Sequence, residues 1–310
     1  MRNYSDSAII KALPYSLLTR EMPNLLQARV EVPQRHVHTL HQPGEPDSSL
    51  LMMPAWGKAG GMGGVKIVNV TPGNSARHLP CVAASYLLFD EQTGIHKALL
   101  DGGELTARRT AAVAAIAADR LTSPGAKRLL LVGSGRIASE LAFAYQSIRA
   151  IEKVDVFSPT RTHADKLVRR LQAEGFKAVV CQDLEAGVRE ADIVACATLS
   201  TSPLIHGDWL CEGQHLALIG GYLPDMREAD DAAIQKCQIW IDTHAAMSES
   251  GDLVGPLSHG IIHFEDICGT LADLCARPPA SGDAKAITLF KSVGDAAQDL
   301  AAATLAVGKA

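Results

Sequence analysis

The hydrophobic pattern of the first hundred residues is that of short strands. Apolar and β-branched residues form brief runs or alternate with polar ones, and Gly, Pro or Asn bound these runs. The pattern predicts a short helical start, followed by strands at 27–32, 64–70 and 83–90. Residues 90–94 predict a hairpin loop. An alanine-rich helix is then expected at 105–121, with Thr106 as a candidate N-cap.

From residue 128 onward, strands and helices alternate. Residues 129–132 form a continuous apolar run, as expected of a strand that is buried on both faces. Similar runs predict further strands at 154–157, 178–180, 193–195, 216–219 and 239–241. Helical patterns at 163–174 and 228–236 fit between some of these strands. This alternation predicts an α/β fold with a doubly wound, parallel sheet of the Rossmann type.

Composition narrows the class of protein and its partners. The chain has 310 residues, of which 47% are apolar and 20% charged, which indicates about two globular domains. Its formal net charge of -5 provides no basic excess for binding nucleic acid. The longest weakly polar stretch, 111–118, is far below the ~20 residues that span a membrane, and the first 18 residues lack a signal-peptide pattern. Seven cysteines without a CxxC motif favour a reducing cytoplasm.

A glycine-rich loop follows the apolar run at 129–132 and opens a helical stretch. It consists of Gly133, Ser134, Gly135, Arg136, Ile137 and Ala138. In this position the first glycine permits a tight turn, the second lets the backbone approach a pyrophosphate, and the small alanine allows close helix packing. The alternative is an ordinary glycine turn before a helix. The context favours a dinucleotide site.

The end of the second expected strand predicts which dinucleotide binds. An acidic residue there favours NAD, whereas a nearby arginine accommodates the 2′-phosphate of NADP. Here the strand is followed by hydroxyl and guanidinium side chains, from Ser158, Thr160 and Arg161, and Asp155 lies inside the strand. We therefore expect NADPH, with NADH as a possible second cofactor. The alternative is that Arg161 is a solvated residue of the first helical turn.

Three basic residues stand in unusual surroundings. Lys66 lies within an expected strand among apolar neighbours, Arg109 lies on the alanine-rich helix, and Arg35 follows a strand end. Charged groups are rarely buried without a partner. Each could be a salt-bridged structural residue, but convergence on one substrate carboxylate would explain all three.

These residues and several motifs together resemble the ornithine cyclodeaminase/mu-crystallin family over nearly the whole chain. The motifs lie at 53–54, 64–66, 72–74, 105–112, 133–135, 220–228, 249–253 and 290–294. The resemblance implies a homodimer. It also implies that 1–112 and 283–310 form a substrate-binding and dimerisation domain, and that 113–282 form the dinucleotide-binding domain. The linker-like residues 277–282, which precede a last strand at 286–290 and a helix at 295–307, agree with this division.

The resemblance also implies roles for individual residues. Arg35, Lys66 and Arg109 would hold a substrate carboxylate, Lys66 and Arg109 being the catalytic pair. Cofactor contacts would come from Cys81, Thr110, Val293 and Gly294, the last two near the nicotinamide. In the cyclodeaminases an aspartate follows the Gly-Gly pair, but here the residue is Tyr222. A phenol, with an ordinary pKa near 10, is a poor base at neutral pH, so Tyr222 is expected to line the substrate site and ornithine cyclisation is not expected.

A cofactor and a carboxylate clamp without a base suit hydride delivery to a C=N bond. The expected substrate is a small cyclic imine bearing a carboxylate, Δ1-pyrroline-2-carboxylate or its six-membered homologue Δ1-piperideine-2-carboxylate, and the expected product of the first is L-proline. Ornithine cyclodeaminase and an alanine or other amino-acid dehydrogenase are the enzymatic alternatives. A cofactor-binding, crystallin-like protein without turnover is the alternative of another class.

Other candidate sites are weaker. His36, His38 and His41 would need Glu45 and Asp47 to complete a metal site, so none is expected. Cys81 lacks an evident His-Asp partner for nucleophilic catalysis. Asp225, Arg227 and Glu228 are expected to open a helix, as caps or domain-interface residues.

Overall fold

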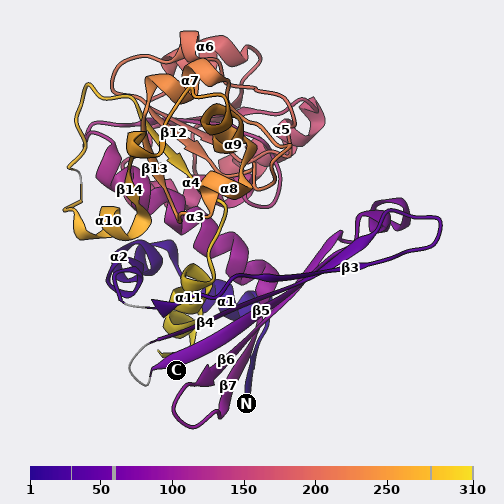
Figure 1. Cartoon of the computed structure of the whole chain (residues 1–310). Coiled ribbons are helices and arrows are strands. Elements are labelled where there is room, and N and C mark those ends of the chain that lie inside the picture. Colours follow the sequence, from indigo (N-terminus) through magenta and orange to yellow (C-terminus); the bar gives the residue numbers. More distant parts are fainter. Residues whose placement is uncertain (29, 58–60, 280, 309–310) are drawn as a thin grey trace. The chain divides into compact units, whose positions relative to one another are not determined.

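The structure, a computed structural model, describes residues 1–28, 30–57, 61–279 and 281–308. The chain forms two compact units (Figure 1). Met1–Arg109 and Asp295–Ala310, from both chain ends, form the end unit, and Thr110–Gly294 form the central unit. The sequence expectation placed the second division at 282/283. It lies at 294/295 because the strand Thr288–Lys291 pairs on both sides within the central sheet.

The end unit is built on a seven-stranded sheet in the order β1-β7-β6-β5-β4-β2, with β3 paired to β4. All pairs are antiparallel except β1 with β7. The strands are β1 (Arg2–Tyr4), β2 (Val30–Glu31), β3 (His36–Leu40), β4 (Ser48–Gly57), β5 (Met62–Val70), β6 (Val82–Asp90) and β7 (His96–Asp101). The strand expected at 27–32 is thus limited to two described residues, because helix α2 continues to Leu26. The hairpin loop expected after β6 is confirmed, with Thr93 hydrogen-bonded to Asp90.

Helices cover one face of this sheet. They are α1 (Asp6–Ala12), α2 (Tyr15–Leu26) and α11 (Ala296–Gly308), and a short 3-10 helix spans Pro72–Arg77. The alanine-rich α11 packs against α2, β4, β5 and β6, where its small side chains permit close approach. Alternation along the strands sends Tyr86, Leu88, Ala98 and Leu100 into the core of this unit.

Helix α3 (Gly102–Leu121) begins earlier than the sequence predicted. Thr106 is inside the helix and is not its N-cap. The Asp101 carboxylate instead accepts the backbone N–H of Glu104 at 2.7 Å, which satisfies a free donor of the first turn. A carboxylate at the strand end thus starts the helix four residues before the hydroxyl that the pattern favoured.

The central unit confirms the predicted parallel, doubly wound sheet. Its eight strands lie in the order β10-β9-β8-β11-β12-β15-β13-β14, and all pairs are parallel. The strands are β8 (Arg128–Val132), β9 (Lys153–Phe157), β10 (Ala178–Val180), β11 (Ile193–Cys196), β12 (His215–Leu218), β13 (Gln238–Ile241), β14 (Ile267–Thr270) and β15 (Thr288–Lys291). The chain proceeds from β8 to one side and then returns to the other. The direction of strand order therefore reverses between β8 and β11, where such sheets bind ligands.

The helices of the central unit follow its strands. They are α4 (Ala138–Gln146), α5 (Arg161–Ala173), α6 (Leu184–Glu190), α7 (Asp231–Lys236), α8 (Ala246–Glu249), α9 (Gly251–Ser258) and α10 (Leu271–Ala276), with short 3-10 helices at Gly207–Trp209 and Phe264–Asp266. The predicted helix at 228–236 is shorter because Asp230 is the N-cap, accepting from the backbone N–H of Ala233 at 2.8 Å. Among the described residues, no helix is both long and apolar enough to cross a membrane.

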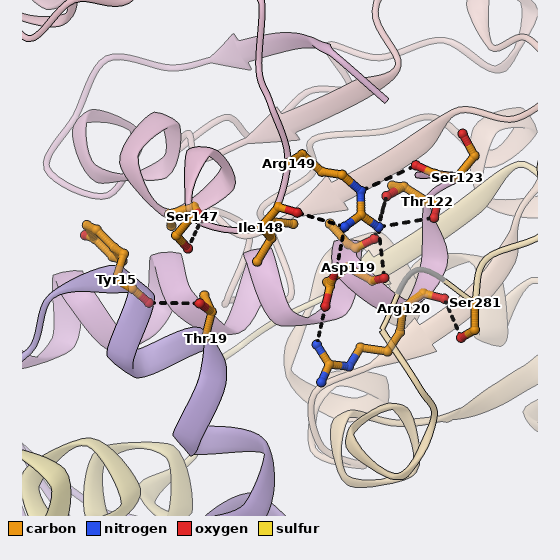
Figure 2. Close-up of polar contacts among 12 residues, drawn as sticks. Tyr15, Thr19, Asp119, Arg120, Thr122, Ser123, Ser147, Ile148, Arg149 and Ser281 are labelled. Carbon is orange, nitrogen blue, oxygen red and sulfur yellow. Dashed lines mark hydrogen bonds and ion pairs between the residues drawn. The ribbon is translucent and has the colours of Figure 1, made fainter. Parts of the chain in front are cut away.

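A buried cluster of arginines fixes the end of α3 within the central unit (Figure 2). Arg149 donates to the Asp119 carboxylate and to the carbonyl oxygens of Asp119 and Ser123, so it caps the C-terminus of α3. Arg120 pairs with the other oxygen of Asp119 at 2.7 Å. All three side chains are more than 90% buried on a residue basis, and the contacts are those of a structural anchor.

Candidate active site

A group of buried charges surrounds Asp299 on α11. The Lys66 ammonium lies 2.7 Å from one carboxylate oxygen, and the Arg109 Nε donates to the other at 2.8 Å. Asp299 is fully buried, and Lys66 and Arg109 are each only 4% exposed. One strand and two helices therefore bring three charges together away from bulk water.

The sheet pattern explains why a lysine is buried here. Lys66 on β5 pairs with Tyr86 on β6, and both side chains face the covered side of the sheet. Two residues before Lys66, Gly64 leaves room for Tyr86: a Cβ there would lie 2.2 Å from the phenol oxygen. Glycine at 64 thus permits the aromatic ring to pack beside Lys66.

Gln298 and Arg35 complete the surroundings. The Gln298 side-chain oxygen accepts from Arg109 Nη1 at 2.8 Å. Arg35 lies half-buried between β2 and β3, and its positive charge acts on Lys66. We call Arg35, Lys66 and Arg109 the cation cluster. Lys66 and Arg109 together carry two positive charges against the one negative charge of Asp299, an excess that an anionic ligand, such as a carboxylate, would neutralise.

The electrostatics of the cluster alter two acid–base groups. Burial lowers the pKa of the Lys66 ammonium, Asp299 opposes this, and Arg109 and Arg35 add to the lowering. Burial by itself would raise the pKa of Asp299, but Arg109 and Lys66 outweigh it and hold that pKa below its usual range. Asp299 is therefore ionised at neutral pH, whereas Lys66 is closer to losing its proton than an exposed lysine.

The glycine loop of the central unit has the geometry that a pyrophosphate requires. Gly133 has φ +113°, and a Cβ there would lie 2.5 Å from the Ala197 carbonyl oxygen. A Cβ at Gly135 would meet no described atom within 4 Å, so the space beside it is open. Ile137, at the N-cap of α4, offers no side-chain cap, and the N–H groups of Ser139 and Glu140 donate to the carbonyl oxygens of Gly135 and Ile137. These residues fit a dinucleotide.

The residues expected at the adenosine end lie together at the carboxyl end of β9. The hydroxyls of Ser134 and Ser158 are 3.1 Å apart. Thr160 is the N-cap of α5 and makes no side-chain cap bond. The Arg161 side chain is 66% exposed, and its Nε lies 4.0 Å from the Asp165 carboxylate, which is the limit for an ion pair. The guanidinium can therefore turn to an anionic ligand.

The side chain of Arg136, which follows the glycines of the loop, has a partner in the structure. Its guanidinium donates to Glu140 at 2.7 Å, and Arg170 donates to the same oxygen at 2.9 Å. Glu140 is nearly buried and attracts both arginines. Arg136 therefore contributes its backbone to the loop, while its side-chain charge is directed to Glu140.

The loops after β12 and β15 carry the other expected site residues of the central unit. Tyr222 is 42% exposed. Asp242, at the end of β13, accepts from the Ser292 hydroxyl at 2.8 Å and from the backbone N–H groups of Val293 and Gly294 at 3.1 and 2.7 Å. A buried carboxylate thus fixes the segment that the resemblance places near a nicotinamide.

Several candidate residues from the sequence lie outside the cation cluster and outside the glycine loop and strand ends of the central unit. Cys81 is in the end unit, with its sulfur 3.9 Å from the Pro72 carbonyl oxygen, and Thr110 is buried at the first position of the central unit. His36 and His38 are exposed on β3, and His41 pairs with Asp47 at 2.9 Å. In the described part of the chain, no three His, Cys, Asp or Glu side chains are arranged to hold a metal.

The expectation that Asp225, Arg227 and Glu228 open a helix is wrong. They precede α7 in an irregular segment. Arg227 pairs forward with Asp231 at 2.7 Å, and Glu228 is fully buried, where it accepts hydrogen bonds from neighbouring loops. The Glu228 carboxylate is buried because it satisfies backbone N–H groups of those loops.

The sequence reasoning missed Gln298, Asp299 and Asp242. The signal for the first two was available, since a Gln-Asp pair interrupts an otherwise alanine-rich apolar helix. Asp242 follows a buried strand directly, at the edge where parallel sheets carry their functional groups. In each case a polar residue, or a pair of them, stands next to an apolar stretch, and this contrast could have identified the functional position.

Comparison with known proteins decides the family. The model of the ornithine cyclodeaminase/mu-crystallin family matches residues 21–310. This chain belongs to that family. Its members include a relative from Paracoccus denitrificans named Delta(1)-pyrroline-2-carboxylate reductase, which is 36% identical over 278 residues, covering 86% of this chain and 87% of the relative.

Solved structures of similar proteins show how far the family fold extends. The Thermococcus litoralis Delta(1)-pyrroline-2-carboxylate reductase in complex with NADH and L-proline is 28% identical, with a TM-score of 0.92 over 100% of this chain and 97% of that one. An archaeal alanine dehydrogenase dimer with bound NAD is 25% identical, with a TM-score of 0.89 over 99% and 95% of the two chains. The similarity therefore includes both units.

Proposed function

We propose that this family member reduces a cyclic imine that carries a carboxylate on the imine carbon, using NAD(P)H. Δ1-Pyrroline-2-carboxylate is the proposed substrate and L-proline the product. The observation that carries the proposal is the buried excess of positive charge around Lys66 and Arg109, beside a fixed acid. The names of the Paracoccus and Thermococcus reductases support it.

The chain's residues have distinct parts in this reaction. A bound dihydronicotinamide supplies a hydride, with its two electrons, to the imine carbon. Lys66, Arg109 and Arg35 bind the carboxylate and so fix the distance and face of that carbon. Asp299 keeps Lys66 and Arg109 apart at fixed positions. The imine nitrogen takes one proton as the C=N bond becomes a single bond.

Tyr222 separates this reaction from ornithine cyclisation. Cyclisation requires oxidation of the amine, attack by the side-chain amine and loss of ammonia, with proton removal at several stages. Tyr222 stands where the cyclodeaminases carry an aspartate, and a neutral phenol can donate or orient but not readily accept a proton near pH 7. Imine reduction has no step that needs a base.

NADPH is the proposed preferred cofactor, with NADH as a second one. The support is the hydroxyl-rich carboxyl end of β9 and the exposed guanidinium of Arg161, since this fork suits a 2′-phosphate. Asp155, the nearest acid on β9, is paired with Lys153 at 2.9 Å and is not at the strand end. The Thermococcus complex with NADH is the reason to test both.

A homodimer is also proposed, with the end unit as its dimerisation domain. Large apolar side chains on its sheet are exposed, namely Val37, Leu40, Ile67 and Val82 at 38–55%. Figure 1 shows β3 on the part of this sheet that extends beyond α1, α2 and α11. The alanine dehydrogenase relative is a dimer. In sedimentation, Val37→Asp with Val82→Asp is expected to give a monomer, and an unchanged dimer would place the interface elsewhere.

An amino-acid dehydrogenase is the second candidate, favoured by the alanine dehydrogenase relative. A cofactor-binding protein without turnover is disfavoured because Arg35, Lys66 and Arg109, the basic residues expected to hold a substrate, are all present beside Asp299. The cytoplasm, with its reducing conditions and NADPH supply, is the proposed compartment.

A substrate screen tests the proposal. The purified protein is given NADPH or NADH with the five-membered imine, the six-membered imine, or pyruvate with ammonia. In reverse it is given L-proline or L-ornithine with the oxidised cofactor. Oxidation of the reduced cofactor with a cyclic imine supports the proposal. Turnover only with pyruvate and ammonia identifies an amino-acid dehydrogenase instead.

A further inference from the structure

A buried carboxylate joins the ends of two neighbouring strands in the central unit. One oxygen of Glu228 accepts from the backbone N–H and the hydroxyl of Thr198 at 2.7 and 2.9 Å. The other accepts from the N–H groups of Gly220 and Gly221 at 2.8 and 3.4 Å. Thr198 follows β11 and the glycines follow β12. Glu228 therefore holds two loops together with four donors, the pattern that a carboxylate requires.

Two further charges complete this network. Asp252 on α9 accepts from the backbone N–H groups of Glu228 and Ala229 at 2.8 and 3.1 Å. Its second oxygen pairs with the Lys291 ammonium at 3.0 Å, at the end of β15. Glu228, Asp252 and Lys291 are all fully buried. We call them the buried ion network, and its net charge is one negative.

The position of the network in the fold gives this charge a role. Dinucleotides lie across the carboxyl ends of the strands on both sides of the point where strand order reverses. The adenosine half belongs with Ser158 and Arg161 after β9, so the nicotinamide half falls over β11 and β12. Those are the strands whose ends Glu228 joins. Asp242, at the end of β13 and two strands from β12, is a further buried carboxylate at this edge of the sheet.

We propose that the buried ion network, through Glu228, favours the oxidised form of the nicotinamide cofactor over the reduced form. The nicotinamide ring gains a positive charge when its C–H bond breaks and the hydride leaves with both electrons for the imine carbon. A net negative charge at these strand ends stabilises that positive charge and assists hydride donation. Glu228 acts here as a positioning and electrostatic residue and touches no reacting atom. The inference rests on the proposed use of a nicotinamide cofactor.

Burial and charge act in opposite directions on Glu228. Burial raises the pKa of its carboxyl, Lys291 opposes this, and Asp252 adds to it. The four donors around its oxygens favour the ionised form. Retaining such a carboxylate in the interior costs free energy. Because all four partners are donors, only an acceptor-only carboxylate satisfies them, and this contact brings a negative charge to the strand ends.

The test measures binding of both cofactor forms, NADP⁺ and NADPH, to the wild type and to Glu228→Gln. The variant removes the charge in nearly the same volume. At an effective dielectric near 20, a unit charge changes the binding of a cation by roughly tenfold even across about 10 Å. We expect the ratio of the NADP⁺ Kd to the NADPH Kd to rise about tenfold, and single-turnover hydride transfer to slow.

A matched control separates charge from structure. Thr198→Val removes one hydrogen bond from the same carboxylate but leaves its charge, so the Kd ratio is expected to stay that of the wild type. Asp252→Asn neutralises the other acid and serves if Glu228→Gln does not fold; its ratio should rise similarly. An unchanged ratio in the charge variants overturns the inference while leaving the proposed function intact. Failure of the wild type to bind either form overturns the proposed function itself.

Discussion

Replacing Asp299 by asparagine tests whether charge holds the cation cluster together. The substitution keeps the shape of the side chain and one acceptor oxygen but removes the negative charge between Lys66 and Arg109. Both cations are 4% exposed, so water cannot replace the lost charge. Removing one partner of a buried ion pair typically costs about 3–5 kcal/mol. Because one acceptor remains, we expect a loss of about 3 kcal/mol in the stability of the end unit.

Hydrogen exchange of α11 amides and urea unfolding measure this loss. Exchange is informative because it reports the end unit separately from the central unit. Asp295→Asn is the matched control: it lies just before the same helix, accepts the Ala297 N–H at 2.7 Å, and asparagine caps helices equally well. We expect the control to stay within about 0.5 kcal/mol of the wild type. A similar loss in both variants would refute the reasoning.

The pH dependence gives a second check on the same variant. The folded pKa of Asp299 is lowered, because Arg109 and Lys66 outweigh burial. Its contribution is therefore present above the unfolded pKa of about 4 and is lost as the pH falls through the folded pKa. The difference in unfolding free energy between wild type and Asp299→Asn should shrink in acid. A difference that is independent of pH would show that charge is not the cause.

The pH dependence of kcat/KM for Asp299→Asn should also change, at alkaline pH, where Lys66 loses its proton. The groups facing Lys66 are Asp299 on α11, Arg109 on α3, Arg35 on the loop before β3 and Tyr86 on β6. Asp299 raises the pKa of Lys66 against burial and the two arginines. Without it Lys66 loses its proton more easily, so kcat/KM of Asp299→Asn should decline at lower pH than in the wild type. Coincident alkaline limbs would remove Lys66 from substrate binding.

Four further substitutions test the site. Lys66→Met or Arg109→Met should lower kcat/KM by a factor that corresponds to a loss of about 3 kcal/mol or more in transition-state stabilisation, since each removes a charge-assisted bond to a desolvated carboxylate. The cofactor Kd should change little. A kcat/KM within a few-fold of the wild type would place the carboxylate elsewhere. Arg161→Ala should raise the KM for NADPH much more than that for NADH, and equal effects would exclude it from the 2′-phosphate site. Tyr222→Phe should keep imine reduction within about tenfold of the wild type, and a larger loss would assign the phenol a role in proton transfer.

The sequence predicted the central unit well because its strands are buried on both faces. Residues 129–132 form an unbroken apolar run that is typical of a covered parallel strand, and the glycine loop follows it directly. In the end unit β1, β3, β4 and β7 were not predicted, and the strand expected at 27–32 is limited to two described residues. All five residues of β3 are exposed, so its pattern lacks the apolar alternation of a half-buried strand.

The sequence predicted those site residues that are charged but stand among apolar or small neighbours. Lys66 among apolar neighbours and Arg109 on a small-residue helix are unfavourable positions that only a partner explains. Asp299, 190 residues after Arg109, could not be assigned as that partner without the fold. Glu228 was wrongly expected to open a helix. Its carboxylate oxygens accept hydrogen bonds from the loops that follow β11 and β12, which lie earlier in the chain. Pairings across such distances depend on tertiary structure and leave no local pattern.

The central claim is tested most directly by comparing two reactions of the purified protein. In one, Δ1-pyrroline-2-carboxylate is supplied with NADPH, and cofactor absorbance and L-proline are followed. In the other, L-ornithine is supplied with NADP⁺ or NAD⁺, and ammonia is followed. We predict stoichiometric formation of L-proline in the first reaction and no ammonia above background in the second. Ammonia release from ornithine at a rate comparable to imine reduction would contradict the account.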